Sequence, residues 1–317
     1  MPFIQSYIQN SSTVVRDLKM LDIPEGALLF TPNAKSMYTN IDTNTGISAI
    51  QEFIMTNTKH LPLNFPTALF LQILAIVMGN NIFDFAGTYW RQCSGTAMGM
   101  PAACAYATIL FGNQENNKIL PMFKSQLIYY KHCIDDIFGI LIPPNKNKIR
   151  TWNAFKEELN NWGHLVWVIE DPSLKTTFLD LNFQLNGSTV ITSTFQKLMN
   201  LYLYIPPNSS HPPSCLKRLI AHKLRCYYTQ NNTENFQNML VKFISRLLDR
   251  GHTIKELTPL LLQAASTLDR QNIQLKENNK QSTIYIHWTY HPNGLQQRDL
   301  RRAFDTTLND TLPYNRK

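Results

Sequence analysis

Residues 129–138 read YYKHCIDDIF, and this stretch decides the fold. The surrounding segment, Leu127 to Leu141, alternates in polarity and is rich in Tyr and Ile, a pattern typical of β-strands. Asp135 and Asp136 stand at its centre, so we expect a strand, a tight turn and a second strand. Two adjacent carboxylates at the tip of a hairpin repel each other unless a cation joins them. A solvated Asp-Asp turn is the ordinary alternative for an isolated pair, so the interpretation depends on the rest of the chain.

Composition favours a globular protein with an anionic partner. The chain has 317 residues, 44% of them hydrophobic, which is enough for one large domain or two modest ones with buried cores. Its formal net charge of +8 favours a partner such as nucleic acid. Because this charge is spread along the chain, it indicates a groove more than a basic arm.

Cysteine usage and hydropathy indicate an intracellular protein, nuclear or cytoplasmic. The five cysteines are odd in number and irregularly spaced, so we expect no disulfides, and we identify no secretory leader. The longest apolar stretch, Ala68 to Met78, is interrupted by Gln72. It is about half as long as the roughly 20 residues that a membrane span needs, so we expect no transmembrane segment.

Strands and helices are expected to mix up to about residue 200. Proline near a first turn and glycine at an end indicate the helices, and alternation of apolar and polar residues indicates the strands. The expected elements are a strand-like run at Leu28–Met37, helices at Asn44–Met55, Pro66–Gly79 and Pro101–Asn113, and a hairpin of Ile82–Phe85 and Thr88–Gln92.

Beyond Pro206 the chain is predicted to be helical. Apolar residues recur at helical spacing from Phe236 to Leu248, and a further helix is expected to begin at Thr258 with Pro259 in its first position. The polar stretch Gln274–Ser282 is a linker candidate, and Ile284–Trp288 suggests one more strand.

Several ordered motifs accompany the acidic hairpin. Lys35–Ile41 lies at a strand-to-helix junction, and Gly95–Pro101 (GTAMGMP) precedes a helix. Downstream lie Phe178–Leu181, Gln196–Asn200 and Ser209–Pro213. Together these motifs resemble the palm of reverse transcriptases of the Penelope-like retroelement type, over residues from about 20 to 295.

This resemblance implies an α+β fold with an antiparallel palm sheet, helices packed on one face, and a helical thumb. The implied domains are a palm with residual fingers at 1–206, a thumb at 207–275 and a C-terminal extension at 276–317. It implies an RNA-directed DNA polymerase that uses two Mg²⁺ or Mn²⁺ ions, an RNA or DNA template with a primer, and deoxynucleoside triphosphates.

The resemblance also assigns roles to residues. Asp135 and Asp136 would be the metal-binding carboxylates, and Tyr38 would be the steric gate that excludes a 2′-hydroxyl, although a core aromatic is the plain alternative. Gly95, Met98 and Gly99 would lie at the nascent base pair, where glycine permits close approach of the backbone.

Three departures from the family pattern weaken the expected activity. Asn33 stands where the family carries a metal-binding aspartate, and a neutral amide offers no charge to the ions. Asp42 lies past the strand end and is not expected to substitute for it. Cys133 replaces the usual aromatic residue before the acidic pair. About 32 residues precede this motif, which leaves little material for fingers and suggests N-terminal truncation.

A basic stretch follows the palm. No Asp or Glu occurs between Leu181 and Thr233, and the stretch is a candidate nucleic-acid groove carrying Lys197, Lys217, Arg218, Lys223 and Arg225. Its tyrosines, Tyr202, Tyr204, Tyr227 and Tyr228, could stack on bases, but a half-buried strand is the default interpretation of the Leu-Tyr-Leu-Tyr run.

Two His-x3-Cys pairs in this stretch could be drawn as a zinc site. The pairs are His211 with Cys215 and His222 with Cys226. Their spacings match no common zinc module, so a structural role is preferred. The leading hypothesis is therefore a reverse-transcriptase domain impaired by Asn33. A non-catalytic nucleic-acid-binding protein and an inactive retroelement remnant remain the alternatives.

Overall fold

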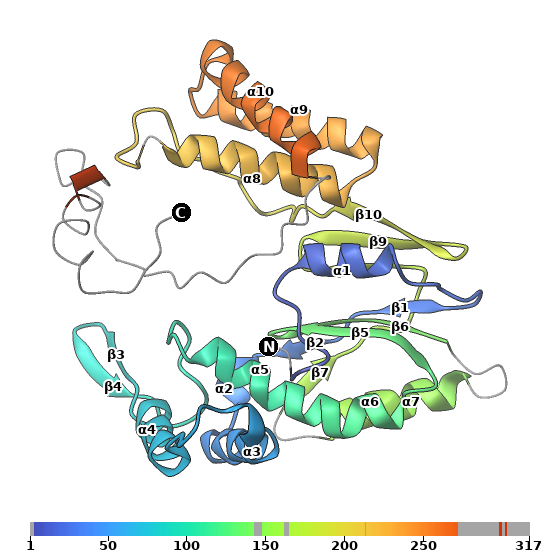
Figure 1. Cartoon of the computed structure of the whole chain (residues 1–317), viewed down its shortest axis with the longest axis vertical. Coiled ribbons are helices and arrows are strands. Elements are labelled where there is room, and N and C mark those ends of the chain that lie inside the picture. The colour runs from blue at the N-terminus through green and yellow to red at the C-terminus, as the bar shows by residue number, and fades with distance from the viewer. Residues whose placement is uncertain are drawn as a thin grey trace. The chain divides into compact units, whose positions relative to one another are not determined.

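The structure, a computed structural model, describes residues 3–142, 148–161, 165–212 and 214–271, together with residues 298, 299 and 302. The chain divides into two compact units, residues 1–196 and 197–317 (Figure 1). The boundary expected at residue 206 lies inside the second unit. The predicted linker at 274–282 and strand at 284–288 lie outside the described residues, as does most of the expected C-terminal extension.

A five-stranded antiparallel sheet forms the centre of the first unit. β5 (Leu127–Cys133) and β6 (Asp136–Leu141) form the predicted hairpin. The other edge of β6 pairs with β1 (Leu28–Phe30) and β2 (Asn33–Lys35), and β2 also pairs with β7 (Val166–Val168). The single strand-like run expected at Leu28–Met37 is therefore wrong in detail. Pro32, which has no N–H for a ladder, separates two short strands that follow each other along β6.

Side chains alternate between the two faces of this sheet. Ile137 and Leu141 of β6 pack with helices, whereas Phe138 and Ile140 pack in a second core on the opposite face. Gly139 faces the helical side, where a Cβ would lie 2.1 Å from the ring of Phe30. The sheet is thus covered on both faces.

Helices cover one face of the sheet (Figure 1). This helical layer contains α2 (Met37–Asn40), α3 (Thr43–Thr56), α5 (Ala103–Gln114), the π-helical η2 (Glu115–Ile119), α6 (Leu120–Met122) and α7 (Lys148–Asn160). α4 (Thr67–Gly79) packs against α3, and the short η1 turn (Thr58–His60) lies between these two helices in sequence. The structure confirms the helices predicted at α3, α4 and α5. Each of them was predictable because the sequence carries a local start or stop signal.

The other face is covered by α1 (Ser11–Leu18) and a three-stranded antiparallel sheet. That sheet consists of β8 (Lys175–Phe178), β9 (Leu181–Asn186) and β10 (Thr189–Thr194). Phe178 and Phe183 pack against Phe138, with Phe138 and Phe183 ring centroids 4.4 Å apart. This aromatic core holds the acidic hairpin from the side opposite the helices.

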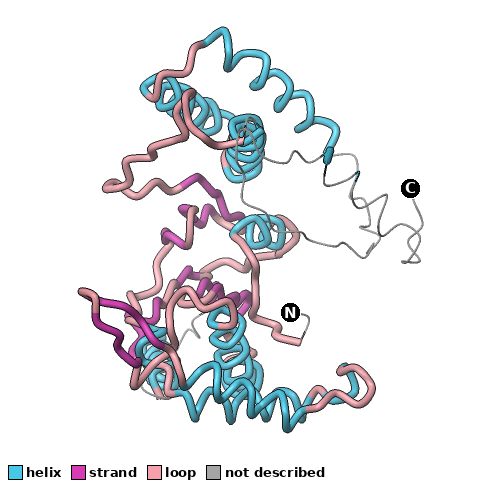
Figure 2. Tube along the Cα trace, turned by 90° about the vertical axis from the view of Figure 1, so that its left-hand side faces the viewer, coloured by secondary structure: helices cyan, strands magenta, loops and turns pink. Residues whose placement is uncertain are grey.

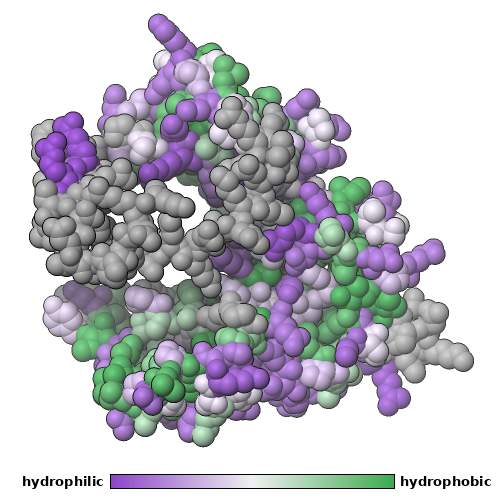
Figure 3. Space-filling view, in the orientation of Figure 1, coloured by the Kyte–Doolittle hydropathy of each residue, from purple (hydrophilic) through white to green (hydrophobic). Residues whose placement is uncertain are grey.

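α4 and the predicted hairpin of β3 (Ile82–Phe85) and β4 (Thr88–Arg91) carry an exposed apolar surface. Only Leu74 and Met78 of α4 are buried. Exposed side chains are Leu69, Phe70, Ile73, Ile76, Val77, Ile82, Phe83, Phe85, Tyr89 and Trp90. Figure 3 shows this apolar region at the lower left. Among the described residues, no helix is long and apolar enough to cross a membrane.

Within the described part of residues 197–271, the second unit contains three packed helices (Figures 1 and 2). They are α8 (Ser214–Gln230), α9 (Thr233–Asp249) and α10 (Ile254–Gln271), around a core that includes Phe243 and Leu257. α10 begins before the expected Thr258, so Pro259 lies inside the helix. The earlier start is supported by the Thr253 hydroxyl, which accepts a hydrogen bond from the Glu256 N–H at 3.3 Å.

Candidate active site

The acidic turn is held in an unusual backbone conformation. Ile134 and Asp135 connect β5 to β6, and Cys133 faces Asp136 across the hairpin. Ile134 has a φ of +59°, the left-handed region that a β-branched residue seldom adopts. Such a conformation costs about 1–3 kcal/mol and persists where surrounding contacts enforce it. The turn that carries the two carboxylates is therefore fixed by its neighbours.

Asn33 lies beside the acidic pair, on the neighbouring strand. Asn33 of β2 is directly opposite Asp136 of β6, and its side-chain Nδ2 donates a hydrogen bond to Asp136 Oδ1 at 2.5 Å. Ala34, the next residue of β2, stabilises the turn, because its N–H donates a hydrogen bond to the Asp135 carbonyl at 2.9 Å. Residues 33, 135 and 136, far apart in sequence, thus form one cluster.

The possible oxygen ligands for a metal ion in this cluster are two carboxylates and one amide carbonyl. Carboxylate oxygens are the ligands that Mg²⁺ prefers, so Asp135 and Asp136 fit a divalent ion. Within the described part of the chain, no group of three or more His, Cys, Asp or Glu side chains is placed to hold a metal. Asp42 caps α3 and accepts from the Thr45 N–H at 2.8 Å, a structural use of that carboxylate. Among the described residues this cluster therefore offers two carboxylates, Asp135 and Asp136, and one neutral amide, Asn33.

Tyr38 lies in α2, which follows β2 after Ser36 in the left-handed region (φ +50°). Its hydroxyl is 3.3 Å from the Cys104 Sγ, and the ring is partly buried against the helical core. Burial, the hydrogen bond to Cys104 and the nearby Asp135 carboxylate all raise the pKa of Tyr38. The phenol thus remains neutral at physiological pH and lies near the acidic turn.

The Gly95–Pro101 segment contacts α2. The Thr96 N–H donates to the Tyr38 carbonyl at 2.6 Å, and a Cβ on Gly95 would lie 2.7 Å from the Thr39 carbonyl oxygen. Gly95, at φ +77°, is needed by the protein's own packing. Gly99, at φ +86°, has open space where a Cβ would be, and Met98 is 75% exposed. Met98 and Gly99 are therefore exposed, as is Pro101, whereas Gly95 and Thr96 are buried.

Cys133 is half-buried at the end of β5. Burial raises the pKa of its thiol, and the Asp136 and Asp135 carboxylates raise it further. The thiol is thus neutral and packs beside the acidic turn.

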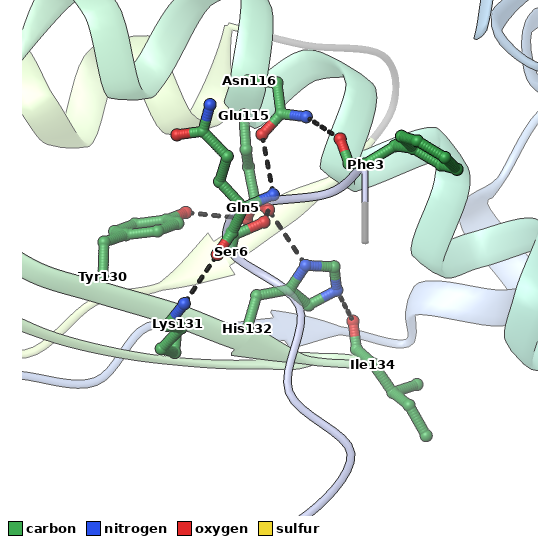
Figure 4. A network of polar contacts seen from close by, with 9 residues as sticks. All are labelled: Phe3, Gln5, Ser6, Glu115, Asn116, Tyr130, Lys131, His132 and Ile134. Carbon is green, nitrogen blue, oxygen red and sulfur yellow. Dashed lines mark hydrogen bonds and ion pairs between the residues drawn. The ribbon is translucent and has the colours of Figure 1, made fainter. Parts of the chain in front are cut away.

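A buried polar network that no sequence motif indicates lies beside the turn (Figure 4). The Glu115 carboxylate of η2 accepts hydrogen bonds from Ser6 Oγ at 2.5 Å and Tyr130 Oη at 2.8 Å. Its Oε2 is also 2.9 Å from His132 Nδ1, and His132 Nε2 is 3.1 Å from the Ile134 carbonyl oxygen. In the sequence, Glu115 and His132 stand among apolar residues, but nothing in that pattern indicates that the two side chains contact each other.

The basic residues of the second unit are not on one face. Arg218 and Arg225, seven residues apart on α8, share the exposed face of that helix. Lys217 is also exposed, whereas Lys223 is partly buried with its Nζ 5.9 Å from the Tyr227 ring centroid. Lys197 is exposed at the start of the unit.

The tyrosines of this stretch serve mainly as core. Tyr204 and Tyr227 both pack against Phe243, and the Arg246 guanidinium lies 4.1 Å from the Tyr202 ring centroid. The expected strand around Tyr202–Tyr204 is wrong, because these residues form a loop.

The His and Cys residues drawn as a zinc site make separate contacts. His222 Nε2 lies 3.5 Å from Cys226 Sγ, one helical turn away, while His211 contacts Ser209.

Comparisons with known proteins show the fold. No protein-family model matches the chain, and the search of curated proteins gives no match either. Among solved structures, telomerase from Candida albicans, in a complex with a fragment of telomeric RNA, has a TM-score of 0.58 at 10% identity. That match covers 86% of this chain and 50% of the telomerase chain. The Sicinivirus 3Dpol RNA-dependent RNA polymerase has a TM-score of 0.50 at 11% identity, over 81% of this chain and 54% of that one.

The chain thus spans about half the length of the polymerase chains it resembles. One neighbour is a telomerase and the other a viral RNA-dependent RNA polymerase, and the likeness extends over most of the present chain. Together with the antiparallel sheet, the acidic hairpin and the three described helices of the second unit, it establishes that this chain has the palm-and-thumb fold of these two neighbours.

Proposed function

We propose that this chain is a reverse-transcriptase-like domain of a Penelope-like retroelement, and that Asn33 impairs its nucleotidyl transfer. The carrying observation is the hydrogen bond from Asn33 Nδ2 to Asp136 Oδ1, beside the turn that presents Asp135. An aspartate at position 33 would place a third carboxylate against the other two. The amide instead offers Asp136 a proton donor where a metal ion would compete for the same oxygen.

Asp135 and Asp136 would hold the divalent ions of this proposed site. When bound, such ions activate the primer 3′-hydroxyl and neutralise the charge of the leaving pyrophosphate. A carboxylate at position 33 would contribute several kcal/mol to that neutralisation, and about 1.4 kcal/mol corresponds to a tenfold change in rate. We therefore expect the rate to be reduced by orders of magnitude relative to a chain with aspartate at position 33.

Tyr38 is the proposed steric gate for the incoming sugar. Its ring lies between the core and the acidic turn, close enough to Asp135 for that carboxylate to raise the Tyr38 pKa. The hydroxyl is tied to Cys104, which limits rotation of the ring. Gly99 and Met98 would border the nascent base pair.

The basic residues of the second unit are the proposed contacts to template and primer. Arg218 and Arg225 form an exposed pair, and Lys197 and Lys217 add exposed charge. Phosphate contacts of this kind give sequence-independent, salt-dependent binding. A non-catalytic nucleic-acid-binding protein is the second candidate, since the Asn33–Asp136 bond satisfies Asp136 without an ion.

Primer extension on an RNA template separates these candidates. The chain and its Asn33→Asp variant are compared with deoxynucleotides in Mg²⁺ and in Mn²⁺. We expect little extension by the unaltered chain and a gain of at least about 100-fold in the variant. Salt-dependent binding of an RNA/DNA hybrid without extension by either protein would favour the binder.

A further inference from the structure

His132 connects the acidic turn to a buried carboxylate. It is fully buried in β5, and its imidazole lies between Glu115 Oε2 at 2.9 Å and the carbonyl oxygen of Ile134 at 3.1 Å. Ile134 is the residue with φ +59° that precedes Asp135. A polar side chain without exposure to water thus contacts the strained residue of the turn.

Each ring nitrogen of His132 faces an oxygen acceptor. A carbonyl oxygen accepts hydrogen bonds and does not donate, so Nε2 must carry a proton. Glu115 already accepts bonds from the hydroxyls of Ser6 and Tyr130, which is the arrangement of an ionised carboxylate. An ionised carboxylate requires a proton on Nδ1 as well, so the geometry indicates a doubly protonated imidazolium.

The electrostatics agree with this geometry. Burial by itself would lower the pKa of His132, but the charge and hydrogen bond of Glu115, followed by the Ile134 carbonyl and Asp135, raise it above its ordinary value. Phe111 contributes an edge-on aromatic contact, with ring centroids 5.8 Å apart. The titratable groups facing His132 are therefore Glu115 and, beyond the turn, Asp135.

The network also includes the N-terminal segment (Figure 4). His132 N–H donates to the Ser6 carbonyl at 2.8 Å, and the Ile8 N–H donates to the His132 carbonyl at 3.1 Å. Gln5 and Asn116 connect the same segment to η2, through a bond of 3.2 Å. The N-terminal segment, η2 and β5 therefore meet around His132 and Glu115.

We propose that His132 is a positioning residue for the carboxylate pair. Its Nε2–H holds the Ile134 carbonyl, and Glu115, itself held by the hydroxyls of Ser6 and Tyr130, holds the ring at Nδ1. The turn thus presents Asp135 and Asp136 in one fixed geometry. The assignment rests on the proposed function, in that it gives this geometry a role in metal binding. The positioning itself can be measured without any metal.

Histidine ring ¹⁵N shifts and amide hydrogen exchange test the positioning directly. In the unaltered chain, both ring nitrogens of His132 should be protonated at neutral pH. In Glu115→Gln, the amide can donate to Nδ1, so the ring should become neutral with its proton on Nε2, and the turn should keep its exchange protection. In His132→Phe, the amides of Ala34 and Ile137, which bond to Asp135 and Pro32 across the turn, should exchange at least about tenfold faster.

The matched control is His252→Phe. His252 is likewise buried between a carboxylate, Glu256, and a backbone carbonyl, that of Ile205, but it lies in the second unit. This variant should leave exchange at Ala34 and Ile137 unchanged. A His132 ring without a proton on Nε2, or unchanged exchange in a folded His132→Phe, would overturn the positioning role. If His132→Phe does not fold, the ring shifts of the unaltered chain and Glu115→Gln decide.

Metal affinity then connects positioning to function. In the Asn33→Asp background, His132→Phe should weaken Mn²⁺ binding about 10- to 100-fold, the usual effect of removing a group that orients metal ligands, whereas His252→Phe should not weaken it. Equal affinities in folded His132→Phe and its parent would overturn the role in metal binding. Failure of the Asn33→Asp parent to bind Mn²⁺ would instead refute the proposed function, while the exchange and ring-shift results still stand.

Discussion

Replacing Asn33 by aspartate should destabilise the metal-free protein and make its stability depend on divalent ions. In the structure, the Asn33 amide donates to the Asp136 carboxylate at 2.5 Å. Asn33→Asp removes this donor and places a second negative charge against Asp136. Both effects act on the same contact, and both oppose folding.

The size of the effect follows from these two terms. A hydrogen bond to a charged group contributes about 1.5–3 kcal/mol. Two carboxylates about 4 Å apart repel by about 1 kcal/mol in water and about 4 kcal/mol at an effective dielectric constant of about 20. Because Asn33 is exposed, the lower values apply, and we expect a loss of about 3 kcal/mol. For a unit of this size that corresponds to a fall in Tm of about 6–12 °C.

Thermal unfolding with and without Mn²⁺ measures the effect. An ion present at 100 times its Kd stabilises the folded state by about 2.7 kcal/mol, so Mn²⁺ should restore most of the lost Tm in the variant. Asn182→Asp is the matched control, because the Asn182 Oδ1 accepts a hydrogen bond from Thr177 at 2.9 Å that an aspartate retains. Its Tm should change little and should not respond to Mn²⁺. An Asn33→Asp protein as stable as its parent in EDTA, or insensitive to Mn²⁺, would refute this reasoning.

Three further predictions concern the gate, the basic helix and the buried ion pair. In the Asn33→Asp background, Tyr38→Ala should raise ribonucleotide incorporation at least about tenfold relative to deoxynucleotide incorporation, whereas Tyr38→Phe should not. Single-nucleotide extension measures this ratio, and equal selectivity in all three proteins would exclude Tyr38 as the steric gate. The double variant Arg218→Ala, Arg225→Ala should lower the slope of log affinity against log salt concentration for an RNA/DNA hybrid by about 2. The comparison is Lys242→Ala with Lys255→Ala, because these two lysines are also exposed in the second unit. Equal slopes for the two double variants would show that α8 does not contact the nucleic acid. The pKa of His132 in the folded protein is raised above its ordinary value of 6.5, so the His132–Glu115 ion pair stabilises fully below pH 6.5 and less as pH rises through the folded pKa. Urea unfolding at several pH values should show this loss in the unaltered chain but not in Glu115→Gln. Free energies of unfolding that change with pH in the same way in both proteins would contradict the prediction.

Local signals predicted many elements from the sequence. The β5–β6 hairpin follows from alternation around the acidic pair, and α4 from Pro66 and Gly79 at its ends. The α+β palm and helical thumb, which the resemblance implied, are confirmed. Asn33 and Asp136 do lie together, as the resemblance implied, because β2 pairs with β6.

Contacts between distant segments were not predictable from one sequence. The two-sided core depends on β8 and β9 covering the face opposite the helices, which strand alternation alone does not reveal. The pairing of Glu115 with His132 depends on η2 lying against β5, and no local pattern records that placement. The start of α10 was missed because the Thr253 cap outweighed the usual position of Pro259.

The most direct test of the central claim is Mn²⁺ binding by the unaltered chain and by Asn33→Asp, measured by electron paramagnetic resonance. We expect the aspartate to tighten binding at least about tenfold, because it supplies a charged ligand beside Asp135 and Asp136. Asp135→Asn in the same background should abolish the gain. Equal Mn²⁺ affinity with asparagine or aspartate at position 33 would show that position 33 does not belong to a metal site.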